Sequence, residues 1–253
     1  MDALLALYSV WRRDLVRFAR QRSRVVGALL TPVLFWLVLG SGLGQSFQAG
    51  SERGYLEYYF PGTLALVVLF TAIFSTISVI EDRNEGFLQG ALASPAPRAA
   101  LVLGKALGSA TLATGNAALC LVLVPVVGLP VSALAVPGTL VMIALMGVGL
   151  SGLGVLLAWG LRSTQGFHAL MNVLLVPMWL TSGAVFPADG AAGWMQAVMR
   201  ANPLTYGLEG LRAALYGGGS AVPFVTAAAV MLALAAATIL LATLLAMHRR
   251  SEA

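Results

Sequence analysis

The longest stretch without a charged residue, 106–161, places the strongest constraint on how this chain can fold. It runs for 56 residues. As one α-helix it would be about 84 Å long, against a bilayer hydrocarbon core of roughly 30 Å. The prolines between residues 125 and 137 remove backbone donors and break helices. The stretch therefore predicts two membrane-spanning helices, over 101–125 and 137–161.

The rest of the composition points the same way. Charged residues make up 10% of the chain and hydrophobic residues 59%, whereas a soluble domain carries about 25% charged residues to wet its surface. Further apolar runs predict spans over 25–44, 58–80, 169–186 and 223–247. We therefore expect an all-α integral membrane protein with six transmembrane helices, forming a single transmembrane domain over 1–253.

The distribution of basic residues predicts the orientation of these spans. Twelve of the 15 Lys and Arg residues fall on one face of the six-span topology, and Arg53, Arg200 and Arg212 fall on the other. Cytoplasmic loops carry the excess of positive charge, so both termini are expected in the cytoplasm of a bacterial inner membrane. The net charge of +5 is thus interpreted as topology signals and contacts with anionic lipid, not as nucleic-acid binding.

The first 24 residues have an amphipathic pattern. At about 100° per residue, six apolar side chains share one arc of a helix and four arginines occupy the other side. This pattern predicts an interfacial helix lying along the membrane surface over 1–24; the alternative is an arginine-rich topology anchor with no further role. The apolar arc holds Leu4, Leu7, Tyr8, Trp11, Leu15 and Phe18, and the arginines are Arg13, Arg17, Arg20 and Arg24. As site residues of this helix we single out Trp11, Arg13, Arg17 and Arg20.

The cytoplasmic segment 81–98 combines acidic residues with apolar residues at helical spacing. It predicts a short helix with an acidic start and an apolar side, which suits docking into a groove on another protein. The alternative is a solvated connecting loop, but a plain loop gains nothing from an exposed aromatic side chain such as Phe87. The docking candidates are Glu81, Asp82, Arg83, Glu85, Phe87, Leu88 and Leu92.

The outer-face segment 187–222 predicts one or two short helices at the outer interface, before the last span. Glu209 and Arg212 are spaced to pair at i,i+3. The segment is interpreted as a gate over an exit path or, equally, as a cap on the membrane surface. The gate candidates are Asn202, Pro203, Tyr206, Glu209 and Arg212.

Two spans carry small residues at helical spacing, which predicts close helix packing. In 101–125 these are Gly104, Gly108, Thr111 and Gly115, and in 137–161 they are Gly147, Ser151, Gly154 and Ala158. Lys105 lies beside the first set and is interpreted as an interfacial anchor whose ammonium group reaches toward water.

Several local sequences resemble a known family when taken together. After the predicted second span stand Glu85-Gly86, then Ser94-Pro95-x-Pro97-Arg98 and Gly104-Lys105; before the last span stand Phe186-Pro187 and Asn202-Pro203-Leu204-Thr205-Tyr206. With the six spans and the basic amphipathic start, they resemble type-2 ABC exporter permeases over essentially the whole chain.

This resemblance implies that the chain is a half-transporter, a permease subunit that works only in a pair. Two permease copies, identical or related, would pair in the membrane, and each would dock a separate ATP-binding subunit through the coupling helix after the second span. The N-terminal helix would lie near that interface. The chain itself would not be an enzyme, and ATP and Mg would be bound by the partner subunit.

The sequence is consistent with this division of labour. It contains no G-x-x-x-x-G-K-[ST] phosphate loop, and its one cysteine, Cys120, cannot form an internal disulfide. We predict no catalytic, cofactor-binding or metal-binding residues. No charged residue lies at the predicted centre of a span, which argues against ion coupling. An ion-coupled secondary transporter or channel working without ATP, and a non-transporting scaffold, remain the alternatives.

Overall fold

A computed structural model describes most of the chain. The described residues are 3–20, 30, 34, 36–38, 42, 55–93, 96–122, 124, 131, 132, 134–217 and 220–248. This part of the chain is helical and contains no strand, which confirms the expected all-α class for it. The elements are α1 (Ala3–Arg20), α3 (Tyr55–Ser75), α4 (Ser78–Asn84), α5 (Phe87–Ala93), α6 (Arg98–Leu121), α7 (Ala135–Gly160), α8 (Thr164–Leu180), the 3₁₀ turn η1 (Ala188–Gly190), α9 (Gly193–Ala201), α10 (Pro203–Tyr216) and α11 (Phe224–His248).

Three helical stretches of the described chain are long and apolar enough to cross a membrane: Glu57–Asn84, Ala135–Gly160 and Phe224–His248. Each coincides with a predicted span. Two more helices lie where spans were predicted, α6 at 101–125 and α8 at 169–186, but neither is among these three stretches. Helix α6 has 24 residues and includes the polar Lys105 and Asn116, and α8 has 17 residues. The predicted span 25–44 lies largely outside the described residues, so the count of six spans stays a prediction.

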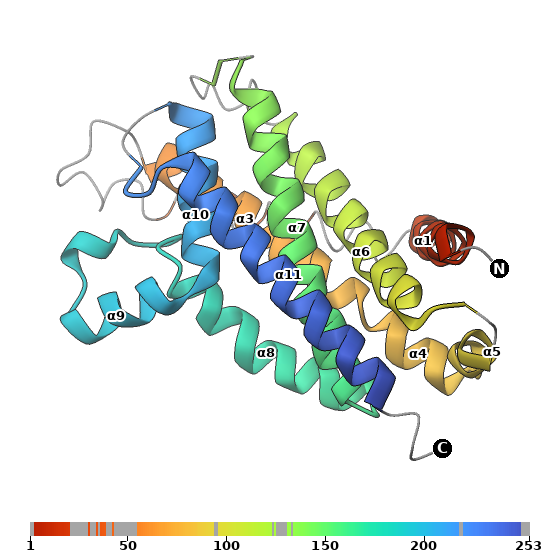
Figure 1. The fold of residues 1–253 in the computed structure, drawn as a ribbon. Coiled ribbons are helices and arrows are strands. Elements are labelled where there is room, and N and C mark those ends of the chain that lie inside the picture. Colours follow the sequence, from red (N-terminus) through yellow and green to blue (C-terminus); the bar gives the residue numbers. More distant parts are fainter. Residues whose placement is uncertain are drawn as a thin grey trace.

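The bundle is organised around α7, which contacts α3, α4, α6, α10 and α11 (Figure 1). Small residues on α7 allow these neighbours to come close. A Cβ at Gly147 would lie 3.2 Å from the backbone oxygen of Ala110 on α6, and one at Gly154 would lie 2.7 Å from the hydroxyl of Thr76. The predicted use of these glycines for helix packing is confirmed.

The cytoplasmic segment 81–98 differs from the single short helix predicted for it. The line of α3 continues through α4 to Asn84, and the chain then turns at Gly86, whose φ of +79° lies in the left-handed region that favours glycine. A new helix, α5, begins at Phe87. The acidic and apolar residues expected on one helix are therefore divided between two.

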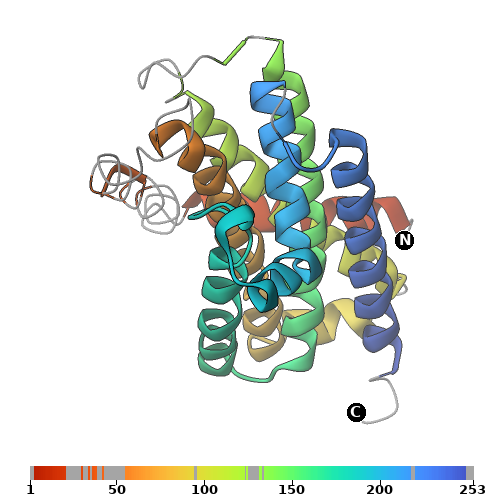
Figure 2. The same cartoon turned by 90° about the vertical axis from the view of Figure 1, so that its left-hand side faces the viewer.

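The segment 187–222 was predicted to form one or two short helices at the outer interface; it forms the short helices α9 and α10, and their place at that interface stays a prediction. Helix α9 leaves the side of the bundle (Figures 1 and 2) and exposes Trp194 and Val198. Helix α10 instead packs among α3, α7 and α11, because its glycines admit neighbouring side chains. A Cβ at Gly210 would lie 2.3 Å from the terminal methyl carbon of Met142. Helix α10 is therefore part of the packed bundle.

Candidate functional site

Helix α1 lies crosswise to the bundle, so it is seen end-on in Figure 1 and lengthwise in Figure 2. It packs on α6 through a stripe at i,i+4 spacing: Ala6, Val10, Asp14 and Phe18. The predicted glycine contacts hold here, since a Cβ at Gly104 would lie 2.9 Å from Cβ of Val10. The Trp11 indole also donates a hydrogen bond to the Thr111 hydroxyl at 3.1 Å.

This packing stripe shares only Phe18 with the apolar arc that the sequence pattern identified. Two of its six side chains face away from the protein, Leu4 at 78% exposed and Tyr8 at 53%, whereas Leu7, Trp11 and Leu15 are half-buried. Because this surface is uncovered and adjoins the basic side of the helix, α1 retains the features expected of an interfacial helix. Its docking on α6 uses a largely different set of residues, although Phe18 belongs to both sets and Trp11 bonds to Thr111.

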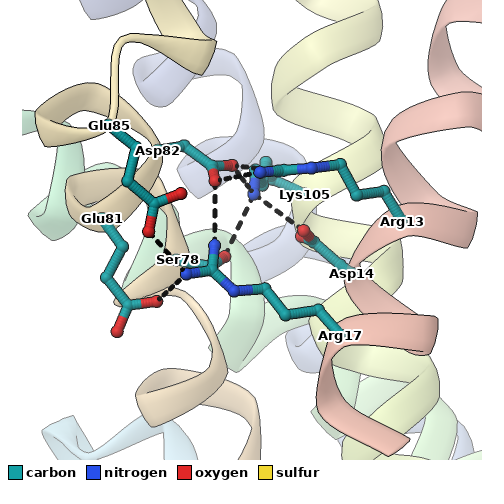
Figure 3. Close-up of polar contacts among 8 residues, drawn as sticks. All are labelled: Arg13, Asp14, Arg17, Ser78, Glu81, Asp82, Glu85 and Lys105. Carbon is teal, nitrogen blue, oxygen red and sulfur yellow. Dashed lines mark hydrogen bonds and ion pairs between the residues drawn. The ribbon is translucent and has the colours of Figure 1, made fainter. Parts of the chain in front are cut away.

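A buried carboxylate, Asp82 of α4, lies at the centre of a cluster of charged side chains (Figure 3). Its side chain has no exposed surface and interacts with three cations. Arg13 donates two hydrogen bonds to it, both at 2.7 Å, Arg17 donates one at 3.0 Å, and the Lys105 ammonium donates one at 2.5 Å. Such charge-assisted bonds are stronger than neutral ones, and the hydrogen bonds that Arg13 donates to Asp82 raise the pKa of its guanidinium group.

Lys105 extends the cluster to α1 and corrects the sequence interpretation. It was expected to reach toward water, but its side chain is 4% exposed and donates to the Asp14 carboxylate at 2.8 Å and the Ser78 hydroxyl at 3.1 Å. A buried ammonium needs paired carboxylates to offset its loss of hydration. Asp14 and Asp82 supply them.

Asp14 is the least satisfied member of the cluster. Its Oδ2 atom is buried and has no hydrogen-bond partner among the described residues. Burial raises the pKa of the Asp14 carboxyl, although Lys105 opposes the shift. Sequence reasoning missed Asp14, Ser78 and Lys105. The available signal was the position of Asp14, an acid on the i,i+4 stripe of small and apolar residues that packs on α6.

The solvent-facing edge of the cluster includes the exposed docking candidates. Arg17 also pairs with Glu81 at 3.2 Å and with Glu85 at 3.0 Å. The Glu85 side chain is 56% exposed, and the guanidinium of Arg13 lies 3.6 Å from the centre of the Phe87 ring, a cation–π distance. We define the charged cluster as Arg13, Asp14, Arg17, Ser78, Glu81, Asp82, Glu85 and Lys105.

The predicted docking residues thus fall into different environments. Asp82 and Leu88 are buried, whereas Glu85 and Phe87 are exposed. Arg83 points away from the charged cluster and donates a hydrogen bond to the backbone oxygen of Leu161, just past α7, at 2.7 Å. The side chain of the seventh candidate, at position 92, lies outside the described part of the chain.

Charged side chains therefore tie the segment after α3 to several helices. The charged cluster joins α4 to α1 and α6, and Arg83 joins α4 to the end of α7, where a cation is favourable beside free helix carbonyls. Near the start of α6, Arg98 donates to the backbone oxygen of Ala246 in α11. A force applied to α4 and α5 would reach four other helices through these bonds.

The predicted pair on the outer side is confirmed: Glu209 and Arg212 are joined at 2.6 Å. The other Glu209 oxygen accepts from the backbone N–H of Ala221 at 2.8 Å. Arg212 donates to the backbone oxygen of Gly183 at 2.8 Å and lies over the ring of Tyr58. This outer cluster connects α3, α10 and the segments on both sides of α10.

The other gate candidates organise the corner between α9 and α10. Asn202 caps α10 by accepting from the N–H of Leu204 at 3.0 Å, and Pro203 occupies the first turn, where its missing donor has no cost. Tyr206 donates to the backbone oxygen of Arg200 at 3.0 Å. These contacts give each residue a structural role, and the gate stays a prediction.

Comparison with known proteins places the chain in a family. Residues 6–216 match the family described as ABC-2 type transporter. The chain is 27% identical to "Putative transport permease ycf38" of Cyanophora paradoxa, covering 81% of this chain and 72% of that protein. It is 25% identical to "Nodulation protein J" of Rhizobium leguminosarum bv. viciae, covering 83% and 82%.

A third relative is named as part of an ABC transporter. It is the "Daunorubicin resistance ABC transporter permease protein DrrB1" of Streptomyces coeruleorubidus, which is 22% identical over 83% of this chain and 75% of its own length. The family match covers the charged cluster, the Glu209–Arg212 pair and the described helices from within α1 to α10. With three stretches able to cross a bilayer, the chain is a membrane protein and belongs to the ABC-2 type transporter family.

Proposed function

We propose that this chain is the membrane-spanning permease subunit of an ATP-driven exporter. A separate ATP-binding subunit would carry ATP and Mg and hydrolyse the nucleotide, so that this chain is not itself an enzyme. Membership of the ABC-2 type transporter family supports the proposal, as does the name of the Streptomyces relative, an ABC transporter permease.

The observation that carries the proposal is the way α5 is attached to the rest of the protein. Phe87 and Glu85 are exposed at the end of the bundle, and the helix before them is bonded to α1, α6 and α7. In the proposed mechanism the ATP-binding subunit contacts the exposed residues. Its closure on ATP moves α5, and the charged cluster transmits that movement to the membrane helices.

We also propose six spans with both termini in the cytoplasm of a bacterial inner membrane. The position of α5 and the end of α11 near one end of the bundle supports this topology (Figure 1). A second permease copy, identical or related, would complete the path between the two subunits. The outer residues Asn202, Pro203, Tyr206, Glu209 and Arg212 would gate its exit.

The test is co-purification in mild detergent with an ATP-binding protein whose gene lies next to that of this chain. We would compare the parent with a Glu85→Arg/Phe87→Asp variant. The matched control is Val198→Asp, because Val198 is exposed to a similar extent as Phe87, 43% against 39%, but lies on α9.

We expect an ATPase-active complex with the parent and the control and its loss with the double variant. No complex with the folded parent would contradict the proposal and would favour the ion-coupled carrier. A complex unaffected by the double variant would contradict docking through α5.

A further inference from the structure

The arginines of α1 form two groups with different surroundings. Arg13 and Arg17 are directed to α4 and bind the carboxylates of the charged cluster (Figure 3). Arg12 and Arg20 are exposed, and no ion pair within the described part of the chain joins either of them to a carboxylate. Among the described residues, the packing of α1 therefore leaves two cations at its surface without a carboxylate partner.

These two arginines border a shallow hollow along α1 that is open to solvent. Its described lining consists of the four α1 arginines at positions 12, 13, 17 and 20 together with Tyr8, Ser9 and Val16. No acidic residue is among them. A concave surface with several guanidinium groups and a hydroxyl favours a phosphate-bearing ligand, since guanidinium groups match phosphate oxygens in a two-bond geometry.

An uncovered apolar stripe runs beside this cationic surface. Leu4 and Tyr8 are exposed, and Trp11 and Leu15 are half-buried. At about 100° per residue these four side chains share one arc, and Arg12 follows next to Tyr8 around the helix. An apolar stripe for acyl chains next to cations for headgroups is the surface that binds an anionic leaflet.

We propose that this face of α1 binds the headgroup of an anionic phospholipid of the bilayer, with Arg12 and Arg20 as the contacts to phosphate. The ligand is a bilayer lipid and not free phosphate, because the adjoining stripe offers acyl chains an apolar surface. Arg13 and Arg17 are already paired with α4, so they contribute positive potential to the site while retaining their carboxylates.

The site lies on the side of α1 away from α6, since Arg12 is exposed and Asp14 is buried against α6. A bound headgroup would therefore hold α1 between the leaflet and the bundle. Because α1 also carries the arginines that bind Asp82, the docking of α1 on α4 would depend on the charge of the surrounding lipid.

The test measures which lipid lies next to α1, and it needs no ATP-binding partner. A Ser9→Cys substitution places a fluorophore at the site, because Ser9 is exposed whereas Cys120 is buried. The labelled chain is reconstituted in phosphatidylcholine vesicles with a small fraction of doxyl-labelled lipid. The readout is the ratio of quenching by doxyl-phosphatidylglycerol to quenching by doxyl-phosphatidylcholine.

At low ionic strength we expect a preference for the anionic lipid on the order of 25-fold, about fivefold from each free arginine. Arg12→Gln/Arg20→Gln should bring the ratio close to one. Arg12→Lys/Arg20→Lys should keep most of it, and added salt should lower it, since the Debye length is about 10 Å at 0.1 M. Glutamine is as good a helix former as arginine, so α1 should still fold.

The matched control is Arg162→Gln, which removes an equally exposed cation just past α7. We expect it to leave the ratio unchanged. Equal quenching by both lipids in the parent would overturn the proposal. So would a preference that survives in the Arg12→Gln/Arg20→Gln variant, or one that the control lowers as much. Because the readout does not involve export, these outcomes are separate from the fate of the proposed function.

Discussion

Replacing Asp82 with asparagine tests whether the charged cluster holds α1 and α4 together. The substitution keeps the shape of the side chain but removes the charge that serves three cations. Lys105, which is 4% exposed, would be left with Asp14 as its carboxylate partner in the cluster. Removing one partner of a buried ion pair costs about 3–5 kcal/mol. Because the two arginines are 30% and 25% exposed and water can solvate them, we expect about 3 kcal/mol.

Glu85→Gln provides the matched control for this experiment. It makes the same chemical change in the neighbouring turn, but the Glu85 side chain is 56% exposed and its pair with Arg17 is open to solvent. Such a pair contributes less than about 1 kcal/mol. The assay is the free energy of unfolding in mild detergent, together with hydrogen exchange of the α1 amides. Equal effects of Asp82→Asn and Glu85→Gln on both readouts would refute the reasoning.

Three further predictions follow from individual contacts. Burial raises the pKa of Asp14 above its ordinary 3.8, so between 3.8 and the raised pKa the folded state holds a proton that the unfolded state has lost, and the stability of the parent falls as the pH rises through this window. The melting temperature of Asp14→Asn should therefore rise relative to that of the parent across the same window. A constant difference between the two melting temperatures would contradict the shift. Gly104→Ala should destabilise the protein by about 1–3 kcal/mol because its methyl group meets α1, whereas Gly115→Ala, with open space, should be neutral or stabilising by up to about 1 kcal/mol in the same unfolding assay. Glu209→Gln should lower the free energy of unfolding by about 2–3 kcal/mol, because it weakens the bonds to Arg212 and to the backbone N–H of Ala221. Hydrogen exchange of the amides just before α11 should become faster. Unchanged exchange would contradict the view that the outer cluster holds this segment in place.

Features of the fold that depend on local sequence were predictable. Helix α7 occupies Ala135–Gly160, close to the predicted 137–161, because a charge-free run after prolines leaves little other choice in a bilayer. Glu209 and Arg212 pair as predicted, because residues three apart on a helix are neighbours. Gly104, Gly108, Gly147 and Gly154 were identified correctly as packing positions for a similar reason, since small residues on one helix face allow close approach. The prediction was wrong for Gly115, which faces open space.

The charged cluster was not predictable, because it depends on how distant segments pack. Lys105 meets Asp82 from 23 positions away and Asp14 from 91 positions away, and no local periodicity encodes such a meeting. The amphipathic pattern of α1 was read as two sides, apolar and basic. The helix has a third side, the stripe through Asp14 that packs on α6, and it contains both apolar and charged residues. A hydrophobic pattern alone therefore could not identify it.

Chemical protection of α5 tests the docking of an ATP-binding subunit most directly. Gln89 is exposed on α5 and Ala197 is exposed on α9, so cysteine substitutions at these positions give a test site and a control, while Cys120 is buried. The rate of maleimide labelling would be measured with and without the ATP-binding subunit. The account predicts that the subunit slows labelling of the Gln89→Cys variant several-fold and leaves Ala197→Cys unchanged. A bound subunit that leaves the Gln89→Cys thiol equally reactive would contradict docking through α5.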